Sequence, residues 1–277
     1  MKKMFTILAP LFIGCSRLHT IQYEPILRAS EWCNKQPCFE LNGLILNQLS
    51  SSILVFILAI QTLFAGYKFF VNNKNQTSRI WWGYTLLLTG IGAILAGISY
   101  QLFGYELKCA DKEFCNWTNW FEIYYNLFTV SGAATLLIAL SYSCFDKKWI
   151  TLIKKIALLK VLIYFIFCLT GAIIPIKFLV SYEFLVLFVV PIYLVLAAFN
   201  CYQYIVSKEN IYKYFLILWI SLFTILGIYF IYLSMDITDI LWTNNIWFSA
   251  NDILHVLMIF WILYIQLFLD DLIIDKK

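Results

Sequence analysis

Residues 214–233 read YFLILWISLFTILGIYFIYL, a run of twenty residues that contains no Asp, Glu, Lys, Arg or His. A helix of about 20 apolar residues is long enough to cross the roughly 30 Å hydrocarbon core of a bilayer. Six further apolar stretches predict spans near residues 46–70, 80–103, 119–142, 150–173, 179–202 and 249–269. The sequence therefore predicts seven membrane-spanning segments.

The composition of the chain agrees with this prediction. Of the 277 residues, 62% are hydrophobic and 13% are charged, whereas soluble domains carry about 25% charged residues. A soluble globular enzyme and a disordered chain are thereby excluded, and no basic run suggests a nucleic acid partner. Because an isolated span must satisfy its own backbone hydrogen bonds, we expect an all-α, seven-helix integral membrane bundle.

The chain divides into four predicted regions. Residues 1–15 form a signal-like leader, because Lys2 and Lys3 precede a short apolar run. An uncleaved amphipathic leader is the alternative, and Gly14-Cys15 resembles a bacterial lipoprotein cleavage site. Residues 16–45 form an outer polar segment, residues 46–269 the transmembrane domain, and residues 270–277 a cytoplasmic tail.

The orientation follows from the positions of lysine and arginine. The loops after spans 1, 3 and 5 and the tail are rich in lysine, whereas acidic residues accompany the lysines of the opposite loops. The positive-inside rule then predicts an N-out/C-in topology. The expected location is a bacterial inner membrane or a eukaryotic secretory-pathway membrane.

Four cysteines fall on the predicted outer side, where disulfides persist. They are Cys33, Cys38, Cys109 and Cys115. They could pair within each segment or between the two segments. A four-cysteine zinc site is a further alternative, although the spacings fit it poorly.

Ionisable side chains are costly inside a membrane and mark candidate functional sites. Nearly all polar residues of the spans fall in the predicted outer half of the membrane, which suggests a pocket that opens outward. Lys160 falls in the inner half, and we interpret it as a lysine whose side chain extends to the inner headgroups. The alternative is a set of interhelical hydrogen bonds, each worth about 0.6 kcal/mol. The pocket candidates are Asn47, Ser50, Ser99, Tyr100, Glu122, Asn126, Glu183, Asn251, Asp252 and His255.

Helical spacing places Asn251, Asp252 and His255 on one face of the last span. A zinc site would use His255 with Asp252, Asn251 and Glu122 as the other ligands. Asp252 and His255 could equally form an acid–base or proton-relay pair. The chain has two histidines, which excludes a histidine-rich zinc site.

The last span reads Phe248-Ser249-Ala250-Asn251-Asp252-Ile253-Leu254-His255-Val256. It resembles the last span of the CREST superfamily, which contains the alkaline ceramidases and the progestin/adiponectin-type receptors. The match is closest to uncharacterised bacterial members with an N-D-x-x-H pattern. Two further segments resemble the start of the ceramidases, namely Glu31-Trp32-Cys33-Asn34 and Asn47-Gln48-Leu49-Ser50-Ser51.

This resemblance implies a metal-dependent lipid amide hydrolase built from spans 2, 3 and 7. Asn251 and His255 occupy the positions of the family's histidine pair, so one histidine is replaced. Ser99 and Tyr100 lie near the family's span 2 serine and histidine, and Glu122 stands in for its aspartate.

The sequence thus leads to a divergent CREST-like protein with a membrane lipid as its partner and zinc as its candidate cofactor. For a hydrolase, the candidate catalytic residues are His255, Asp252, Ser99 and Glu122. A non-catalytic lipid-binding receptor or sensor is the alternative, and a transporter is the third reading.

Overall fold

The computed structural model describes residues 17–276. The predicted leader, residues 1–15, lies outside this range. Seven helices in the described range are long and apolar enough to cross a membrane, as predicted. They are α4 (Leu49–Val71), α5 with the π-helical turn η3 (Thr77–Ala96 and Gly97–Leu102), α7 (Trp120–Cys144), α8 (Lys147–Ile173), α9 (Tyr182–Ser207), α10 (Asn210–Ser234) and α12 with the π-helical turn η5 (Ala250–Tyr264 and Ile265–Leu269).

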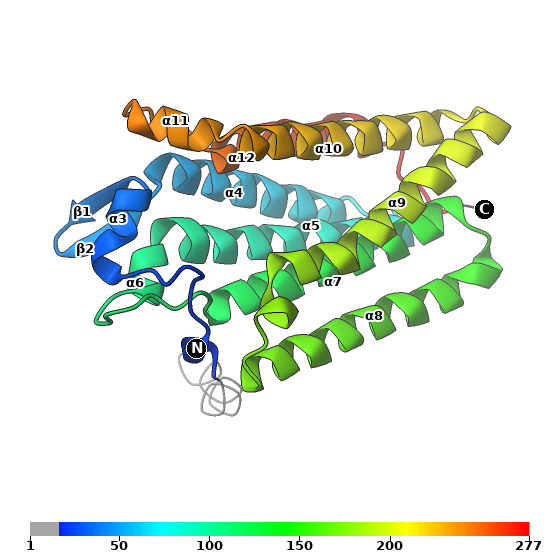
Figure 1. Ribbon diagram of the computed structural model, residues 1–277. Coiled ribbons are helices and arrows are strands. Elements are labelled where there is room, and N and C mark those ends of the chain that lie inside the picture. Colours follow the sequence, from blue (N-terminus) through cyan, green and yellow to red (C-terminus); the bar gives the residue numbers. More distant parts are fainter. Residues whose placement is uncertain (1–16, 277) are drawn as a thin grey trace.

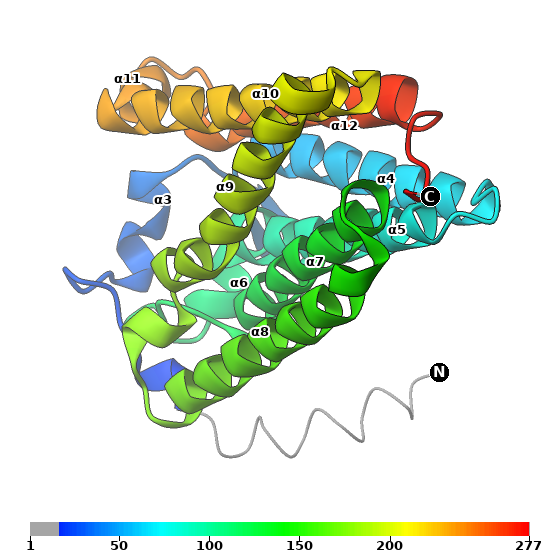
Figure 2. The same cartoon turned by 90° about the vertical axis from the view of Figure 1, so that its right-hand side faces the viewer.

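Six of these helices form a ring, in the order α7, α5, α4, α12, α10 and α9, and α9 closes it by packing on α7. The helix α8 packs on α7 outside this ring. Figures 1 and 2 show α9 crossing obliquely between α8 and α10, whereas α4, α5 and α7 run side by side.

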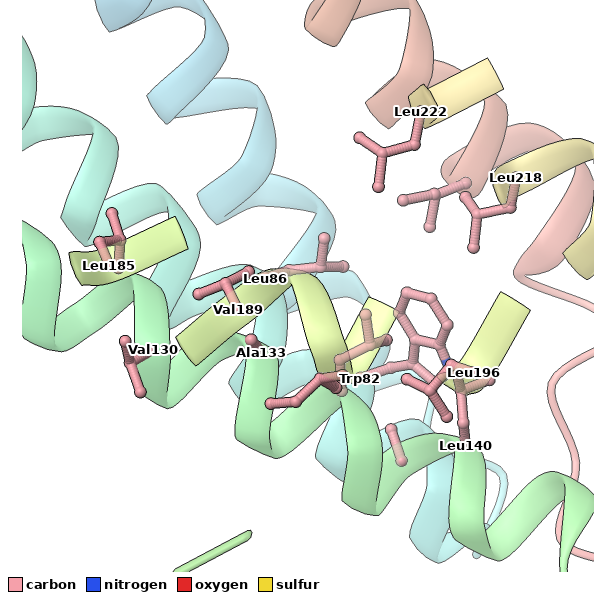
Figure 3. Close-up of a cluster of buried hydrophobic side chains, with 14 of the residues drawn as sticks. Trp82, Leu86, Val130, Ala133, Leu140, Leu185, Val189, Leu196, Leu218 and Leu222 are labelled. Carbon is pink, nitrogen blue, oxygen red and sulfur yellow. The ribbon is translucent and has the colours of Figure 1, made fainter. Parts of the chain in front are cut away.

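The core lies inside the ring and is made of large apolar side chains from α5, α7, α9 and α10. Figure 3 shows Trp82 and Leu86 of α5 facing Val189 and Leu196 of α9. Since many other apolar side chains point outward, such as Leu158 at 71% exposure, the outer surface suits a lipid environment.

The bundle has two distinct ends, visible at the left and right of Figure 1. The disulfide end carries Cys33–Cys38 and Cys109–Cys115, which confirms pairing within each segment. The tail end carries residues 270–276. The helices α4, α7, α9 and α12 begin at the disulfide end, in agreement with the alternating order of the predicted spans.

Short elements cover the disulfide end. They are η1 (Leu18–Thr20), η2 (Ala29–Glu31), α3 (Trp32–Lys35), β1 (Cys38–Leu41), β2 (Leu44–Asn47), α6 (Gly104–Lys108), η4 (Lys177–Val180) and α11 (Ile237–Thr243). The strands β1 and β2 form an antiparallel hairpin, so a small sheet accompanies the predicted helices.

This hairpin corrects one prediction. Asn47 falls within the first predicted span, near residues 46–70, but in the structure it ends β2. Gln48 follows in the left-handed conformation at a φ of 41° and separates the strand from α4. The helix therefore begins at Leu49, three residues later than the predicted start of the first span.

Polar side chains set the first residues of three long helices. Asn119 accepts hydrogen bonds from the backbone of Phe121 and Glu122 at the start of α7. Ser181 accepts from Phe184 at the start of α9, and Ser249 accepts from Asn251 and Asp252 at the start of α12. Such caps satisfy backbone N–H groups that have no partner within the helix.

Candidate functional site

The start of α12 forms the first polar cluster of the disulfide end. The Asp252 carboxylate completes a capping box by accepting from the Ser249 backbone N–H, with Oδ2 2.6 Å from the nitrogen. The same Oδ2 accepts from the Ser51 hydroxyl of α4 at 2.7 Å. Asp252 is fully buried, so this cluster ties the start of α12 to α4 in the interior of the protein.

His255 lies three residues beyond Asp252 and is 8% exposed. Its Nδ1 atom and the second carboxylate oxygen of Asp252, Oδ1, are buried without a hydrogen-bond partner in the described structure. Buried polar atoms are nearly always hydrogen-bonded, to the protein, to water or to a ligand. Each of these two atoms is therefore able to bind a further polar group.

Lys108 and Glu122 form the second polar cluster, between α6 and α7. The Lys108 Nζ atom lies 2.5 Å from Glu122 Oε1, and the two side chains are 5% and 3% exposed. The Ser99 hydroxyl of η3 donates to the same oxygen at 3.0 Å, and the Asn119 side chain donates to Ser99 at 2.7 Å. The carboxylate of Glu122 is thus neutralised within the protein.

The surroundings of Lys108 keep its ammonium charged. Its Nζ donates to the Trp117 carbonyl at 3.1 Å and lies 5.2 Å from the centre of the Tyr100 ring. Burial disfavours the charged form, but the charge of Glu122 and the hydroxyl of Tyr23 outweigh burial and raise the pKa of Lys108 above its ordinary value. Lys108 is therefore an internal cation at neutral pH.

The candidate zinc ligands do not form a metal site. Within residues 17–276, no three His, Cys, Asp or Glu side chains gather where they could hold a metal ion. Glu122 is held by Lys108, and the two serines occupy Oδ2 of Asp252. The residues present do not fit the zinc that the CREST resemblance implies, so we derive no step through a metal.

Two neighbouring clefts open at the disulfide end. The α12 cleft has a volume of about 230 Å³ and is lined by Tyr232, Ser249, Ala250 and Asn251, among others. The hairpin cleft has a volume of about 580 Å³ and lies between residues 33–37 and α11 with the residues after it. Both clefts are lined by Asp239 and Trp242, which places these two residues where the clefts adjoin.

Residues 51–270 match the model of a family described as a family of unknown function (DUF6962). The chain belongs to this family. No curated protein and no solved structure matches the chain. The matched region begins at Ser51 and ends at Asp270, so it contains all but the first two residues of the seven long helices, and it leaves out the hairpin and Cys33–Cys38.

Most predicted pocket residues of this family member take part in the polar clusters or lie beside them. Asn47 accepts from the Tyr105 backbone at 3.1 Å, and Tyr100 stacks edge-on against Tyr125. Asn126 is buried and donates to the Val180 carbonyl at 3.4 Å, while its oxygen has no partner in the described structure. Ser50 is half-buried beside Ser51.

Glu183 lies apart from these residues. It is exposed in the first turn of α9, where Phe184 and Leu185 are the buried side chains. A charged residue at a helix start can face outward while its apolar neighbours face the core, so Glu183 does not belong to a polar pocket.

Three important residues were missed by sequence reasoning. They are Lys108, Asp239 and Trp242, none of which is among the pocket candidates that the sequence suggests. The proximity of Lys108 to Cys109 was the available signal, because a disulfide restricts the backbone beside it. No sequence signal placed α11 next to residues 33–37, since this contact joins segments 200 residues apart in the chain.

Proposed function

We propose that this protein binds a membrane amphiphile, without converting it, through the α12 cleft and the polar pair Asp252 and His255. The observation that carries the proposal is the buried, unpartnered pair of Asp252 Oδ1 and His255 Nδ1. Asp252 and His255 belong to the first turns of α12, which begin with the cleft-lining residues Ser249, Ala250 and Asn251. A hydroxyl, an amide or an ester carbonyl of a bound amphiphile would satisfy one or both of the unpartnered atoms.

The membrane setting supports an amphiphile as the ligand. The helices α10 and α12 beside the cleft are long and apolar enough to cross a membrane, and they expose large side chains such as Phe230 and Phe260. Acyl chains can therefore remain among these side chains while the polar part enters the cleft. The last span also resembles that of the CREST superfamily, and this resemblance likewise predicts a lipid ligand.

The state of the carboxylates favours binding over hydrolysis. Glu122 is neutralised by Lys108, and Asp252 serves as a helix cap and as a link to α4. The donor set for a zinc-bound nucleophile is therefore not assembled in the described residues.

A lipid-binding experiment tests this proposal. The full chain is purified in detergent and titrated with a fluorescent short-chain lipid, and the lipid is analysed afterwards by mass spectrometry. We expect saturable binding that falls about 5- to 30-fold in His255→Ala, because a buried hydrogen bond worth about 1–2 kcal/mol is lost. His19→Ala, which changes the other histidine at an exposed position, should bind like the wild type.

Two results would contradict the proposal. One is the absence of saturable binding to the monodisperse wild-type protein. The other is the appearance of hydrolysed lipid that depends on His255, which would instead favour an enzyme with Asp252 and His255 as an acid–base pair.

A further inference from the structure

The hairpin cleft differs in chemistry from the buried residues Asp252 and His255 of α12. Its volume of about 580 Å³ is in the range of ligand pockets, roughly 300–1,000 Å³. One wall is α3 with the two residues after it, a segment closed by the Cys33–Cys38 disulfide, and the other is α11 with the residues that follow it. The cleft is present in the structure without a ligand, and the disulfide restrains the segment that forms its first wall.

The two walls carry opposite charges. Lys35 lines the α3 wall and Asp239 lines the α11 wall. Both side chains are exposed, and within residues 17–276 neither of them forms an ion pair. Asp236 adds a second carboxylate in the adjoining α12 cleft. A ligand with a cationic and an anionic group would find a partner for each.

Aromatic rings lie next to the carboxylate side of the cleft. Trp242 and Trp247 both line it, and Trp247 is 40% exposed. Tryptophan faces attract ammonium groups within about 6 Å of the ring centre. Tryptophan is also favoured at the headgroup level of a membrane, where its ring meets both apolar and polar surroundings.

The apolar residues around the cleft connect it to the bilayer. Ile240 of α11 and Ile246 after it are 55% and 50% exposed. Exposed isoleucines beside a polar cleft are expected where the headgroup region meets the acyl chains, because water alone would disfavour them. A lipid could therefore place its headgroup in the cleft while its chains stay in the membrane.

We infer that the hairpin cleft recognises a zwitterionic aminophospholipid headgroup. The ammonium lies between Asp239 and the two tryptophan rings, and the phosphate lies against Lys35. The inference rests on the proposed lipid-binding function, for which it names the class of ligand.

The test compares two lipids that share the same chains. The full-length protein in detergent is titrated with fluorescent short-chain phosphatidylethanolamine and with the matched phosphatidylglycerol, which lacks the amine. We expect the amine-containing lipid to bind about tenfold more tightly, since only it can use Asp239 and the tryptophans. Asp239→Asn should remove most of this preference, and Lys35→Ala should weaken both lipids because both carry a phosphate.

Controls separate this inference from the proposed function. Glu183→Gln changes an exposed carboxylate at the same end of the bundle but outside both clefts, and it should preserve the preference. Equal affinity for the two lipids, still lowered by His255→Ala, would overturn the headgroup assignment and leave the proposed function intact. Absence of saturable binding to either lipid would overturn both.

A third arm distinguishes a lipid from a soluble ligand. Glycerophosphoethanolamine carries the same headgroup without acyl chains. We expect it to compete at least a hundredfold more weakly than the lipid, because it buries no acyl chain and each buried CH₂ contributes about 0.8 kcal/mol. Competition with equal strength would overturn the assignment to a lipid.

Discussion

Glu122 and Asp252 are both buried carboxylates in the first turn of a long helix, but their partners give them different roles. Glu122 is matched by a full positive charge on Lys108. Among residues 17–276, Asp252 receives only hydroxyl and backbone donors, all on one oxygen. The first carboxylate is committed to structure, whereas the second keeps an oxygen free for another group.

The Lys108–Glu122 pair predicts a strong effect of removing one partner. Lys108→Met leaves a buried carboxylate without its cation, which should lower the free energy of unfolding by about 3–5 kcal/mol. The double variant Lys108→Met/Glu122→Leu should recover much of this loss, because no unpaired charge remains. Unfolding in detergent, followed by near-UV circular dichroism, measures both, with Lys213→Met as an exposed control.

The same pair predicts a pH dependence. Because the pKa of Lys108 in the folded protein lies above its ordinary value of 10.5, its stabilisation is complete below about pH 10.5. It is lost as the pH rises through the higher, folded-state pKa. Above that pH, the wild-type protein should therefore lose more stability than the variant Lys108→Met/Glu122→Leu. Parallel curves of unfolding free energy against pH for the two proteins would contradict the role of the pair.

At the scale of elements, the contact of α4 with α5 and η3 depends on the absence of side chains. A Cβ at Gly97 would lie 2.6 Å from Cγ1 of Val55, which is itself buried. The added Cβ and the Val55 side chain would lie in the contact between η3 and α4, because these two elements pack directly on each other. The π-helical turn is thereby held against α4, and it in turn positions Ser99 for Glu122.

Gly97→Ala should consequently destabilise the protein by about 1–3 kcal/mol, the usual cost of overpacking. The matched control is Gly227→Ala in α10, where no atom lies within 4 Å of the added Cβ. That substitution should leave stability unchanged or raise it slightly, because alanine favours helix. Thermal unfolding of the two variants measures this difference. Equal melting temperatures would show that η3 can shift to accommodate the added methyl group, and they would contradict the prediction.

At the scale of the whole molecule, the chain after α12 closes the tail end of the bundle. The Asp270 carboxylate pairs with Arg79 of α5, which is fully buried, and with Lys68 of α4 at 2.9 Å. Asp275 accepts from the backbone of Thr77 and Ser78 at the start of α5, and Lys276 reaches Asp146. The predicted cytoplasmic tail is therefore a structural part of the bundle.

Neighbouring aspartates should respond very differently to substitution. Asp270→Asn removes the counter-charge of buried Arg79 and should cost about 3–5 kcal/mol in unfolding free energy. Asp271→Asn removes an exposed pair with Lys74 and should leave the melting temperature unchanged. A similar loss in both variants would mean that the tail acts through its net charge rather than through Arg79.

Sequence reasoning was most successful where one segment suffices to decide the outcome. Seven runs of about 20 apolar residues can satisfy their backbone only as helices, so the long helices were predictable to within a few residues at most ends. The sequence left open whether the four outer cysteines pair within each segment or between the two segments. The disulfides join cysteines five and six residues apart, so the pairing within each segment is the observed one. Orientation in the membrane and kinship with the CREST superfamily stay predictions.

The sequence by itself determined the number and length of the helices and the crowding of polar residues toward one end. Only the tertiary structure decided which of those residues meet. Ser51 reaches Asp252 across 201 positions of the chain, and Lys108 pairs with Glu122. Such pairs depend on the rotation and packing of whole helices, which one local pattern does not specify, and a one-residue turn at Gln48 was enough to move Asn47 from a helix into a strand.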